Sequence, residues 1–506
     1  MKHILLATLL SSLLSPLAAQ QRGDIVSFDS IQHYTATQFS TEVQQLTGLA
    51  PALLGVEYDF NVYRVRYLTQ DYHPDSLTIA SALVSIPMNY PCTQLGLMTF
   101  GHGLCLKNDQ VPSNNQATNS YSLICKGMGG NGFVGVAPDY IHMSEWSSPG
   151  HQAFIHARTE ANCTIDLFRA VRQYCAAHNV GLSGQVFITG YSQGGNSTVA
   201  TAKMIQENHP AEFNIMAAAA GGGSYDLSGV CADSLTSTNR VTPERHSLPL
   251  VIRSLAIVYQ DSLTAWGTGI TPANVIDTVF KSPYREQLPA LLDRFDPMGD
   301  NSFLDSIPAR MINDNYLLGF QSDPNHFFRK LLADNDIDDW APQMPLVLFH
   351  SNIDIENPYQ NAVNTLAKFQ QNGAPDVSLN TVANLTHPAA GQPFVLFALN
   401  MMKSKRIDCK SAALEENQNN SSIALNLYPN PTSDLLNVEL GGIDTKDYTT
   451  VKLFNMNLQL VLQSEFSQQT SLNISHLNAG TYLLSIESAN GNKLFKMFCK
   501  SQSASK

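Results

Sequence analysis

Charged side chains are scarce in this sequence. Only 14% of its 506 residues are Asp, Glu, Lys or Arg, and the 42 acidic residues outnumber the 30 basic ones, giving a net charge of −12. The basic residues form no stripe, so the sequence lacks the electrostatic footprint of a nucleic-acid-binding protein. The composition therefore argues against a nucleic-acid partner.

Cysteines at metal-binding spacings are also absent, and no metal site is predicted. Cys163 and Cys175 share a predicted helix over 157–178. Their twelve-residue separation (175 − 163) spans about 18 Å of helix, too far for a disulfide. Cys105 and Cys125 are a possible pair, and the alternative is that several cysteines are simply small buried residues. The eight are Cys92, Cys105, Cys125, Cys163, Cys175, Cys231, Cys409 and Cys499.

Long apolar runs are missing beyond the N-terminus. There, Lys2 and His3 precede an apolar stretch over 4–17, and small residues follow at 18–19. This pattern predicts a signal peptide over 1–20, because the stretch is too short to span a bilayer. We therefore expect export and no transmembrane anchor.

The sequence does contain a G-x-S-x-G motif at 190–194, between an apolar strand pattern over 185–189 and a small-residue helical pattern over 195–202. A strand, a tight turn through serine and a helix form a nucleophile elbow. The helix N-terminus favours negative charge near the serine oxygen. The motif could arise by chance in a loop, but its flanks favour Ser192 as a nucleophile.

Two downstream loops offer an acid and a base in the chain order of α/β-hydrolases. Asp354 follows a predicted strand over 345–349 and precedes a predicted helix over 359–371. Glu356 is the competing acid, but it lies further from the strand end. His387 follows a predicted strand over 377–382, 33 residues after Asp354 (387 − 354), and precedes a predicted helix over 393–403. Ser192, Asp354 and His387 are thus the predicted catalytic residues.

An oxyanion hole is predicted from backbone N–H groups. One donor is the residue after the nucleophile, Gln193. A predicted strand over 95–100 runs into Gly101-His102-Gly103-Leu104, and we assign the other donor to Leu104, with Gly103 as the next candidate. His102 could be read as a base, but we interpret it as holding this loop by hydrogen bonds.

Residues 55–405 resemble the α/β-hydrolase superfamily, and within it the secretory-lipase-like esterases. The resemblance implies a doubly wound, mostly parallel sheet, a serine esterase activity, and no cofactor or metal. Leu104 departs from the small or hydroxyl residue that often follows His-Gly in the family. The matching segments are 101–103, 111–113, 132–140, 156–157, 160–161, 190–194, 221–227 and the loops of Asp354 and His387.

The strand–helix alternation stops over 228–341, where helical patterns cover 247–265, 273–279, 285–292 and 303–315. An insertion of this size between nucleophile and acid predicts a helical cap over the site. Its aromatic residues could line an acyl pocket, although any single one more often belongs to the core of the cap. They are Trp266, Phe280, Tyr284, Phe295, Tyr316 and Phe320.

Three parts are predicted after the signal peptide: an α/β-hydrolase over 21–410, a polar linker over 411–422 and a small β-sandwich over 423–506. In the last part, alternating runs over 481–486 and 494–498 flank an Asn-Gly turn. Asn-Gly between alternating runs indicates a β-hairpin.

The C-terminal part is similar to the sorting domains of type IX secretion substrates. The matching segments are 427–431, 453–457 and 477–482, and Leu458 stands where glycine is usual. The resemblance implies a partnership with outer-membrane secretion machinery, export through the periplasm, and a secreted or surface location. A generic adhesive or stabilising β module is the alternative.

Together these features predict an exported serine hydrolase that cleaves small-molecule or lipid esters through an acyl-enzyme. A peptidase of the prolyl-oligopeptidase type shares the triad order, but the upstream repeats of that class are not seen. A catalytically silent hydrolase used as a binding module is the other alternative; here all three triad positions are filled.

Overall fold

The computed structural model describes residues 20–293, 302–408, 424–430, 432–441, 448–455, 460–467, 469–488 and 493–501. The predicted signal peptide before residue 20, the linker over 411–422 and Phe295 lie outside these residues.

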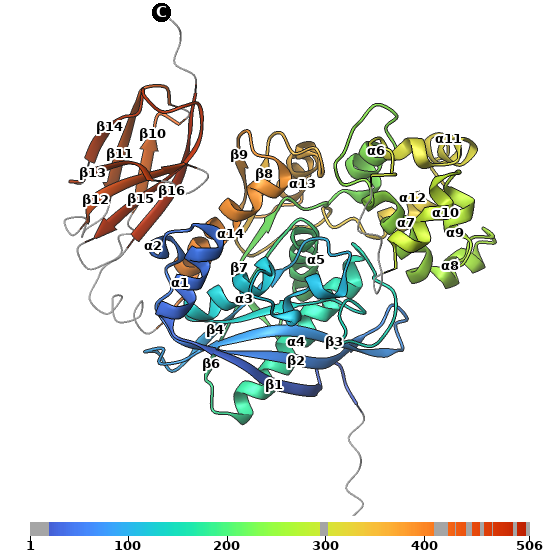
Figure 1. Cartoon of the computed structure of the whole chain (residues 1–506), viewed down its shortest axis with the longest axis horizontal. Helices are drawn as coiled ribbons and strands as arrows, with labels where there is room; N and C mark the ends of the chain where they lie inside the picture. Colours follow the sequence, from blue (N-terminus) through green and yellow to red (C-terminus); the bar gives the residue numbers. More distant parts are fainter. Residues whose placement is uncertain are drawn as a thin grey trace, which may run out of the picture.

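A nine-stranded sheet in the order β1-β2-β3-β5-β4-β6-β7-β8-β9 forms the centre of the molecule (Figure 1). The first three strands pair antiparallel, β3 pairs antiparallel with β5, and the strands from β5 to β9 are parallel. The predicted α/β fold class is thereby confirmed, and β2 and β3 form an antiparallel pair ahead of the parallel strands. The strands are β1 (Ile25–Tyr34), β2 (Phe60–Gln70), β3 (Leu77–Pro87), β4 (Leu95–Gly101), β5 (Phe133–Pro138), β6 (Leu182–Tyr191), β7 (Asn214–Gly221), β8 (Leu346–Ser351) and β9 (Val377–Val382).

Two apolar clusters pack on opposite faces of this sheet, because neighbouring strand residues alternate between them. Leu97 and Ile188 belong to the cluster with α4, α5 and α13, whereas Met98 and Phe187 belong to the cluster with α1, α3 and α14. The helices are α1 (Ala36–Thr47), α2 (Pro51–Leu54), α3 (Ser120–Gly130), α4 (Ala157–Ala177), α5 (Gln193–Asn208), α13 (Tyr359–Gln371) and α14 (His387–Lys405).

Two differences from the predicted elements affect this core. β1 is not among the predicted strands; its mixed polar and apolar sequence suits an edge strand that is only partly buried. The last helix begins at His387 rather than at 393, because Pro388 suits the first turn of a helix. The predicted base therefore stands at a helix start rather than in a loop before it.

The helical cap forms a separate lobe at the right of Figure 1 with its own apolar cluster. The predicted helix over 303–315 is wrong: a short 3₁₀ turn over Pro308–Met311 is followed by α11, and α12 was not predicted. Breakers at Pro308 and Asn313 separate these pieces. The cap helices are α6 (Ala232–Leu235), α7 (Ser247–Val258), α8 (Gln260–Ala265), α9 (Val275–Val279), α10 (Tyr284–Leu291), α11 (Asp314–Ser322) and α12 (Phe327–Ala333).

The C-terminal part is a small all-β unit of a three-stranded sheet, β10-β11-β14, and a four-stranded sheet, β13-β12-β15-β16. The predicted hairpin corresponds to the antiparallel pair β15–β16. The strands are β10 (Ala424–Tyr428), β11 (Leu435–Gly441), β12 (Tyr448–Asn455), β13 (Leu460–Glu465), β14 (Gln469–Asn473), β15 (Gly480–Ser488) and β16 (Lys493–Lys500).

Apolar side chains of the β unit pack against the hydrolase. Phe454 of β12 and Leu483 of β15 are cross-strand neighbours and are buried in the same cluster as side chains of α1, α3 and α14. Their sequence neighbours Leu453 and Leu484 point into the core of the β unit instead. The outer face of this sheet therefore packs on the hydrolase, although the polar linker predicts few contacts between the two parts.

We expect the double variant Phe454→Ser, Leu483→Ser to lower the melting temperature of the hydrolase by a few degrees, since about 1 kcal/mol shifts Tm by roughly 2–4 °C even in mid-sized domains. Removing residues 424–506, which keeps Cys409, should have a similar effect and leave the hydrolase folded. Calorimetry of both forms checks this, with the exposed Leu435 changed to Ser as the matched control. A double variant with the same melting temperature as the wild type would show that the contact contributes no stability.

Candidate active site

The turn that carries Ser192 is strained and tightly packed. Ser192 has φ 60° and ψ −120°, between the end of β6 and the start of α5. A positive φ is costly for a residue with a Cβ and persists only where its surroundings enforce it. Here the enforcement is close packing: a Cβ on Gly194 would overlap the carbonyl oxygen of Gly101, and one on Gly190 would overlap that of Gly194.

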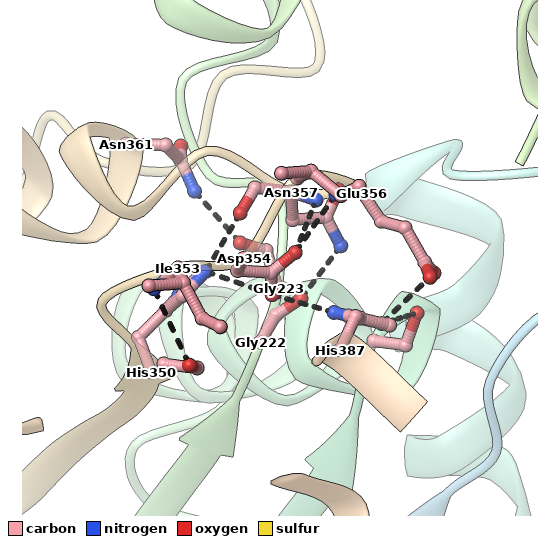
Figure 2. Close-up of polar contacts among 12 residues, drawn as sticks. Gly222, Gly223, His350, Ile353, Asp354, Glu356, Asn357, Asn361 and His387 are labelled. Carbon is pink, nitrogen blue, oxygen red and sulfur yellow. Dashed lines mark hydrogen bonds and ion pairs between the residues drawn. The ribbon is translucent and has the colours of Figure 1, made fainter. Parts of the chain in front are cut away.

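The three predicted catalytic side chains form one hydrogen-bonded chain. His387 Nε2 lies 2.8 Å from Ser192 Oγ, and His387 Nδ1 lies 2.6 Å from Asp354 Oδ2 (Figure 2). Ser192 follows β6, Asp354 lies in the loop after β8, and His387 begins α14 beyond β9. Parallel strands bring these three carboxyl ends to one edge of the sheet.

Asp354 is held as a carboxylate by several donors. The N–H groups of Glu356 and Asn357 each donate to its Oδ1 at 2.9 Å, and His350 Nε2 lies 3.3 Å from its Oδ2. Burial alone would raise the pKa of Asp354, but the hydrogen bonds from His350 and His387 hold that pKa well below its usual range. Asp354 is thus a fixed negative charge on the Nδ1 side of His387.

Glu356, the competing acid, lies on the other side of the imidazole. Its Oε2 is 3.9 Å from His387 Nε2, and burial raises the pKa of Glu356 to about 7. Burial lowers the pKa of His387, but the hydrogen bond and charge of Asp354, with the charges of Glu356 and Glu244, more than offset this and raise it overall. The position of Glu356 in the sequence did not indicate that its carboxylate would lie beside Nε2 of His387, the nitrogen that faces Ser192.

The predicted oxyanion donors lie around Ser192. A Cβ on Gly103 would come within 3.4 Å of Ser192 Cβ, so this backbone approaches the nucleophile closely. Gly103, Leu104, Ser192 and Gln193 line the same cavity. Gln193 opens α5, where first-turn N–H groups have no acceptor within the helix. His102 is buried, and its Nδ1 lies 2.6 Å from the carbonyl oxygen of Gly103.

A cavity of about 610 Å³ opens from Ser192 and His387. Its long wall is α14, which lines it from His387 to Leu399; that separation of twelve residues corresponds to about 18 Å of helix. The segment over 39–56 and α3 complete the apolar walls, and the segment from the turn after β7 to α7 adds further lining residues. Side chains of these walls include Phe39, Val43, Leu49, Leu54, Leu123, Ile124, Val395, Leu227, Leu235 and Val251.

None of the five cap aromatics that the structure describes lines this cavity; the alternative, that such rings more often belong to the core of the cap, fits most of them. Phe280 is 1% exposed within the core of the cap, and Trp266 is 49% exposed at its surface. Most of these rings pack between the helices of the cap itself. The apolar lining of the cavity comes mainly from α1, α3 and α14. The other three are Tyr284, Tyr316 and Phe320.

The possible disulfide between Cys105 and Cys125 is wrong, since these two buried side chains are not bonded to each other. Cys163 and Cys175 are likewise not joined to each other, as their separation along one helix predicts. Cys92 is disulfide-bonded.

The described residues contain neither a membrane-spanning helix nor a metal-binding cluster. Among these residues, no helix combines the length and hydropathy needed to cross a membrane. The same residues hold no cluster of three or more His, Cys, Asp or Glu side chains suited to a metal ion.

Two segments match described families. Residues 111–237 match the family described as Secretory lipase, and residues 426–500 match the Secretion system C-terminal sorting domain. A secreted triacylglycerol lipase of Malassezia globosa is 22% identical over 352 residues, which cover 65% of this chain and 68% of that lipase.

Solved structures are similar to the hydrolase part. The rice cell wall degrading esterase LipA from Xanthomonas oryzae is 24% identical, with a TM-score of 0.65 over 76% of this chain and 100% of that one. Candida antarctica lipase A is 16% identical, with a TM-score of 0.54 over 76% of this chain and 82% of that one. At these identities the likeness establishes the fold.

The chain therefore combines an α/β-hydrolase fold that resembles secretory lipases with a C-terminal sorting domain. The matches support a hydrolase of the lipase and esterase type. The sorting domain indicates a secreted or surface-held protein.

The pKa of His387 gives a test of this geometry that does not need a substrate. Asp354→Asn should lower it strongly, because a hydrogen-bonded negative charge on Nδ1 is lost. Glu356→Gln should lower it by less, because a more distant charge is removed. Titration of the His387 ring signals by NMR measures both shifts. A larger shift in Glu356→Gln would mean that the two carboxylates are assigned to the wrong sides of the ring.

Proposed function

We propose that this protein is an exported serine hydrolase that cleaves carboxylic esters through an acyl-enzyme intermediate. The observation that carries the proposal is the continuous chain Asp354–His387–Ser192, with links of 2.6 and 2.8 Å, at the mouth of an apolar cavity. A serine hydroxyl becomes nucleophilic when an adjacent imidazole can take its proton.

In the proposed reaction, Ser192 Oγ attacks the ester carbonyl while His387 Nε2 accepts the hydroxyl proton. Asp354 holds the Nδ1–H tautomer and stabilises the imidazolium that forms. The N–H groups of Gln193 and Leu104, with Gly103 as the alternative to Leu104, stabilise the oxyanion. His387 then protonates the leaving alcohol, and the same groups carry water through the second half of the reaction.

The shape of the cavity supports an ester with a long apolar acyl chain. The cavity follows α14 away from Ser192 and is walled mainly by aliphatic and aromatic side chains. Burial of each CH₂ group contributes about 0.8 kcal/mol, so such walls favour an extended alkyl chain over a short polar one. The similarity to a secreted triacylglycerol lipase agrees with this substrate class.

Export completes the proposal. The apolar stretch over 4–17 would direct the chain into the periplasm, and the sorting domain would engage outer-membrane secretion machinery of the type IX kind.

Ser192→Ala should lower the rate of ester hydrolysis by several orders of magnitude, because the variant loses the nucleophile. Its melting temperature should stay within a few degrees of that of the wild type, because the substitution leaves the packing unchanged. Activity is measured on p-nitrophenyl esters of graded chain length, with aminoacyl anilides as the peptidase alternative. A fluorophosphonate probe should label the wild type and not the variant. Labelling or hydrolysis that persists in the variant would reject Ser192 as the nucleophile.

Leu399→Trp should shift the preferred acyl chain to shorter lengths. The added ring fills the part of the cavity beside α14 that lies far from His387, so rates on long-chain esters should fall by about tenfold or more while short-chain rates persist. Trp266→Ala is the matched control in the cap and should leave the chain-length profile unchanged. A uniform loss at all lengths in Leu399→Trp would show a packing defect instead.

A further inference from the structure

The side chain of Gln193, next to the nucleophile, is held by a buried glutamate. Gln193 Nε2 donates to Glu160 Oε1 at 2.8 Å, and the backbone N–H of Ile155 donates to the same oxygen at 2.9 Å. Glu160 lies in the first turn of α4 and is 1% exposed, and Gln193 is 4% exposed. This contact joins α4 to the first residue of α5.

Two oxygen atoms of this pair are left without donors. Glu160 Oε2 and Gln193 Oε1 are both buried and have no hydrogen-bond partner. An ionised carboxylate can only accept, so it cannot satisfy the amide oxygen. When the amide N–H on the side of the amide oxygen donates to one oxygen of a coplanar carboxyl group, the amide oxygen and the second carboxyl oxygen come to face each other. One proton on Glu160 Oε2 would therefore satisfy both atoms.

We propose that Glu160 is a neutral carboxylic acid in the working enzyme and that its Oε2–H donates to Gln193 Oε1. The two groups then form a cyclic pair with two hydrogen bonds. Glu160 acts as a positioning residue, because it fixes the side chain of the residue whose backbone N–H is a proposed oxyanion donor. This inference rests on the proposed function for its kinetic consequence, but the protonation itself does not.

The surroundings of Glu160 favour the neutral form. Cys163 of α4, Tyr140 just after β5 and Gln193 of α5 interact with its carboxyl group. His156, the residue before α4, accepts the backbone N–H of Glu160 at its carbonyl oxygen. Burial, reinforced by the charge of Arg158, lowers the pKa of His156 to about 3, so this ring is uncharged at neutral pH. Burial raises the pKa of Glu160 to about 8, partly offset by the hydrogen bonds from Gln193 and Ile155.

Ionisation of Glu160 would break the cyclic pair. Above the pKa of Glu160, its carboxylate would face Gln193 Oε1 as two acceptors without a proton between them. The side chain of Gln193 would lose one of its two attachments, and its backbone N–H would be less firmly aimed at the oxyanion. Since an oxyanion donor acts in the transition state, kcat should fall at alkaline pH while KM changes little.

The test compares the pH profiles of kcat and KM for wild type, Glu160→Gln and Glu160→Ala on p-nitrophenyl butyrate. Glutamine preserves the cyclic pair as an amide–amide pair and cannot ionise. We expect kcat of Glu160→Gln within about threefold of wild type at pH 7 and no decline above about pH 8. Glu160→Ala should lose at least about tenfold in kcat, toward the roughly 10²–10³ cost of one oxyanion donor. Glu212→Gln, in a surface ion pair with Arg169, is the matched control and should keep the wild-type profile.

A second measurement holds even if Glu160→Ala does not fold. The infrared difference spectrum of wild type minus Glu160→Gln at pH 6.5 should contain a protonated carboxyl C=O band that fades as the pH rises through about 8; the subtraction removes the band of Glu356, whose pKa is raised to about 7. Absence of that band would overturn the proposal, as would an alkaline decline that persists unchanged in Glu160→Gln. Ester hydrolysis that survives in Ser192→Ala would reject the proposed function instead, and the infrared result would still decide the state of Glu160.

Discussion

The positive φ of Ser192 is the constraint on which the rest of the site depends. Holding this backbone conformation requires β6, α5 and the end of β4 to meet so closely that Gly190, Gly194 and Gly101 have no room for side chains. The same packing brings the backbone of Gly103 beside Ser192 and starts α5 at Gln193. Strain at one residue is therefore maintained by the whole parallel part of the sheet.

The two faces of the sheet serve different purposes. The cluster with α4, α5 and α13 is closely filled and includes buried rings such as Phe168 and Phe369. The cluster with α1, α3 and α14 borders the cavity, so part of the apolar surface there is left for a ligand. Because His387 is the first residue of α14, the helix that presents the imidazole also forms the cavity wall. The helix α14 thus fixes both the position of His387 and the depth of the cavity.

Much of this arrangement could be predicted from local sequence. The strand patterns around 95–100, 185–189 and 345–349 match β4, β6 and β8, because buried parallel strands read as continuous apolar runs. The pattern over 377–382 matches β9, an edge strand in which apolar and polar residues are mixed. Motif order was enough to select three side chains that the structure brings within hydrogen-bonding distance. What could not be predicted depends on contacts between distant segments: Glu356 facing His387 Nε2, Glu160 facing Gln193, and α1 lining the cavity. The aromatic content of the cap left two interpretations open, since composition cannot distinguish a ring in a core from a ring in a pocket.

The free cysteines acquire a particular meaning in a protein destined for an oxidising environment. Burial raises the pKa of the thiols of Cys125, Cys175 and Cys231 to about 12, so almost none of each is the reactive thiolate at neutral pH. The native fold thereby keeps these sulfurs reduced by kinetics rather than by a reducing compartment. An unfolded chain has no such protection, and its thiols could exchange with one another. Loss of the native fold would therefore expose these thiols to oxidation and to disulfide exchange at the same time.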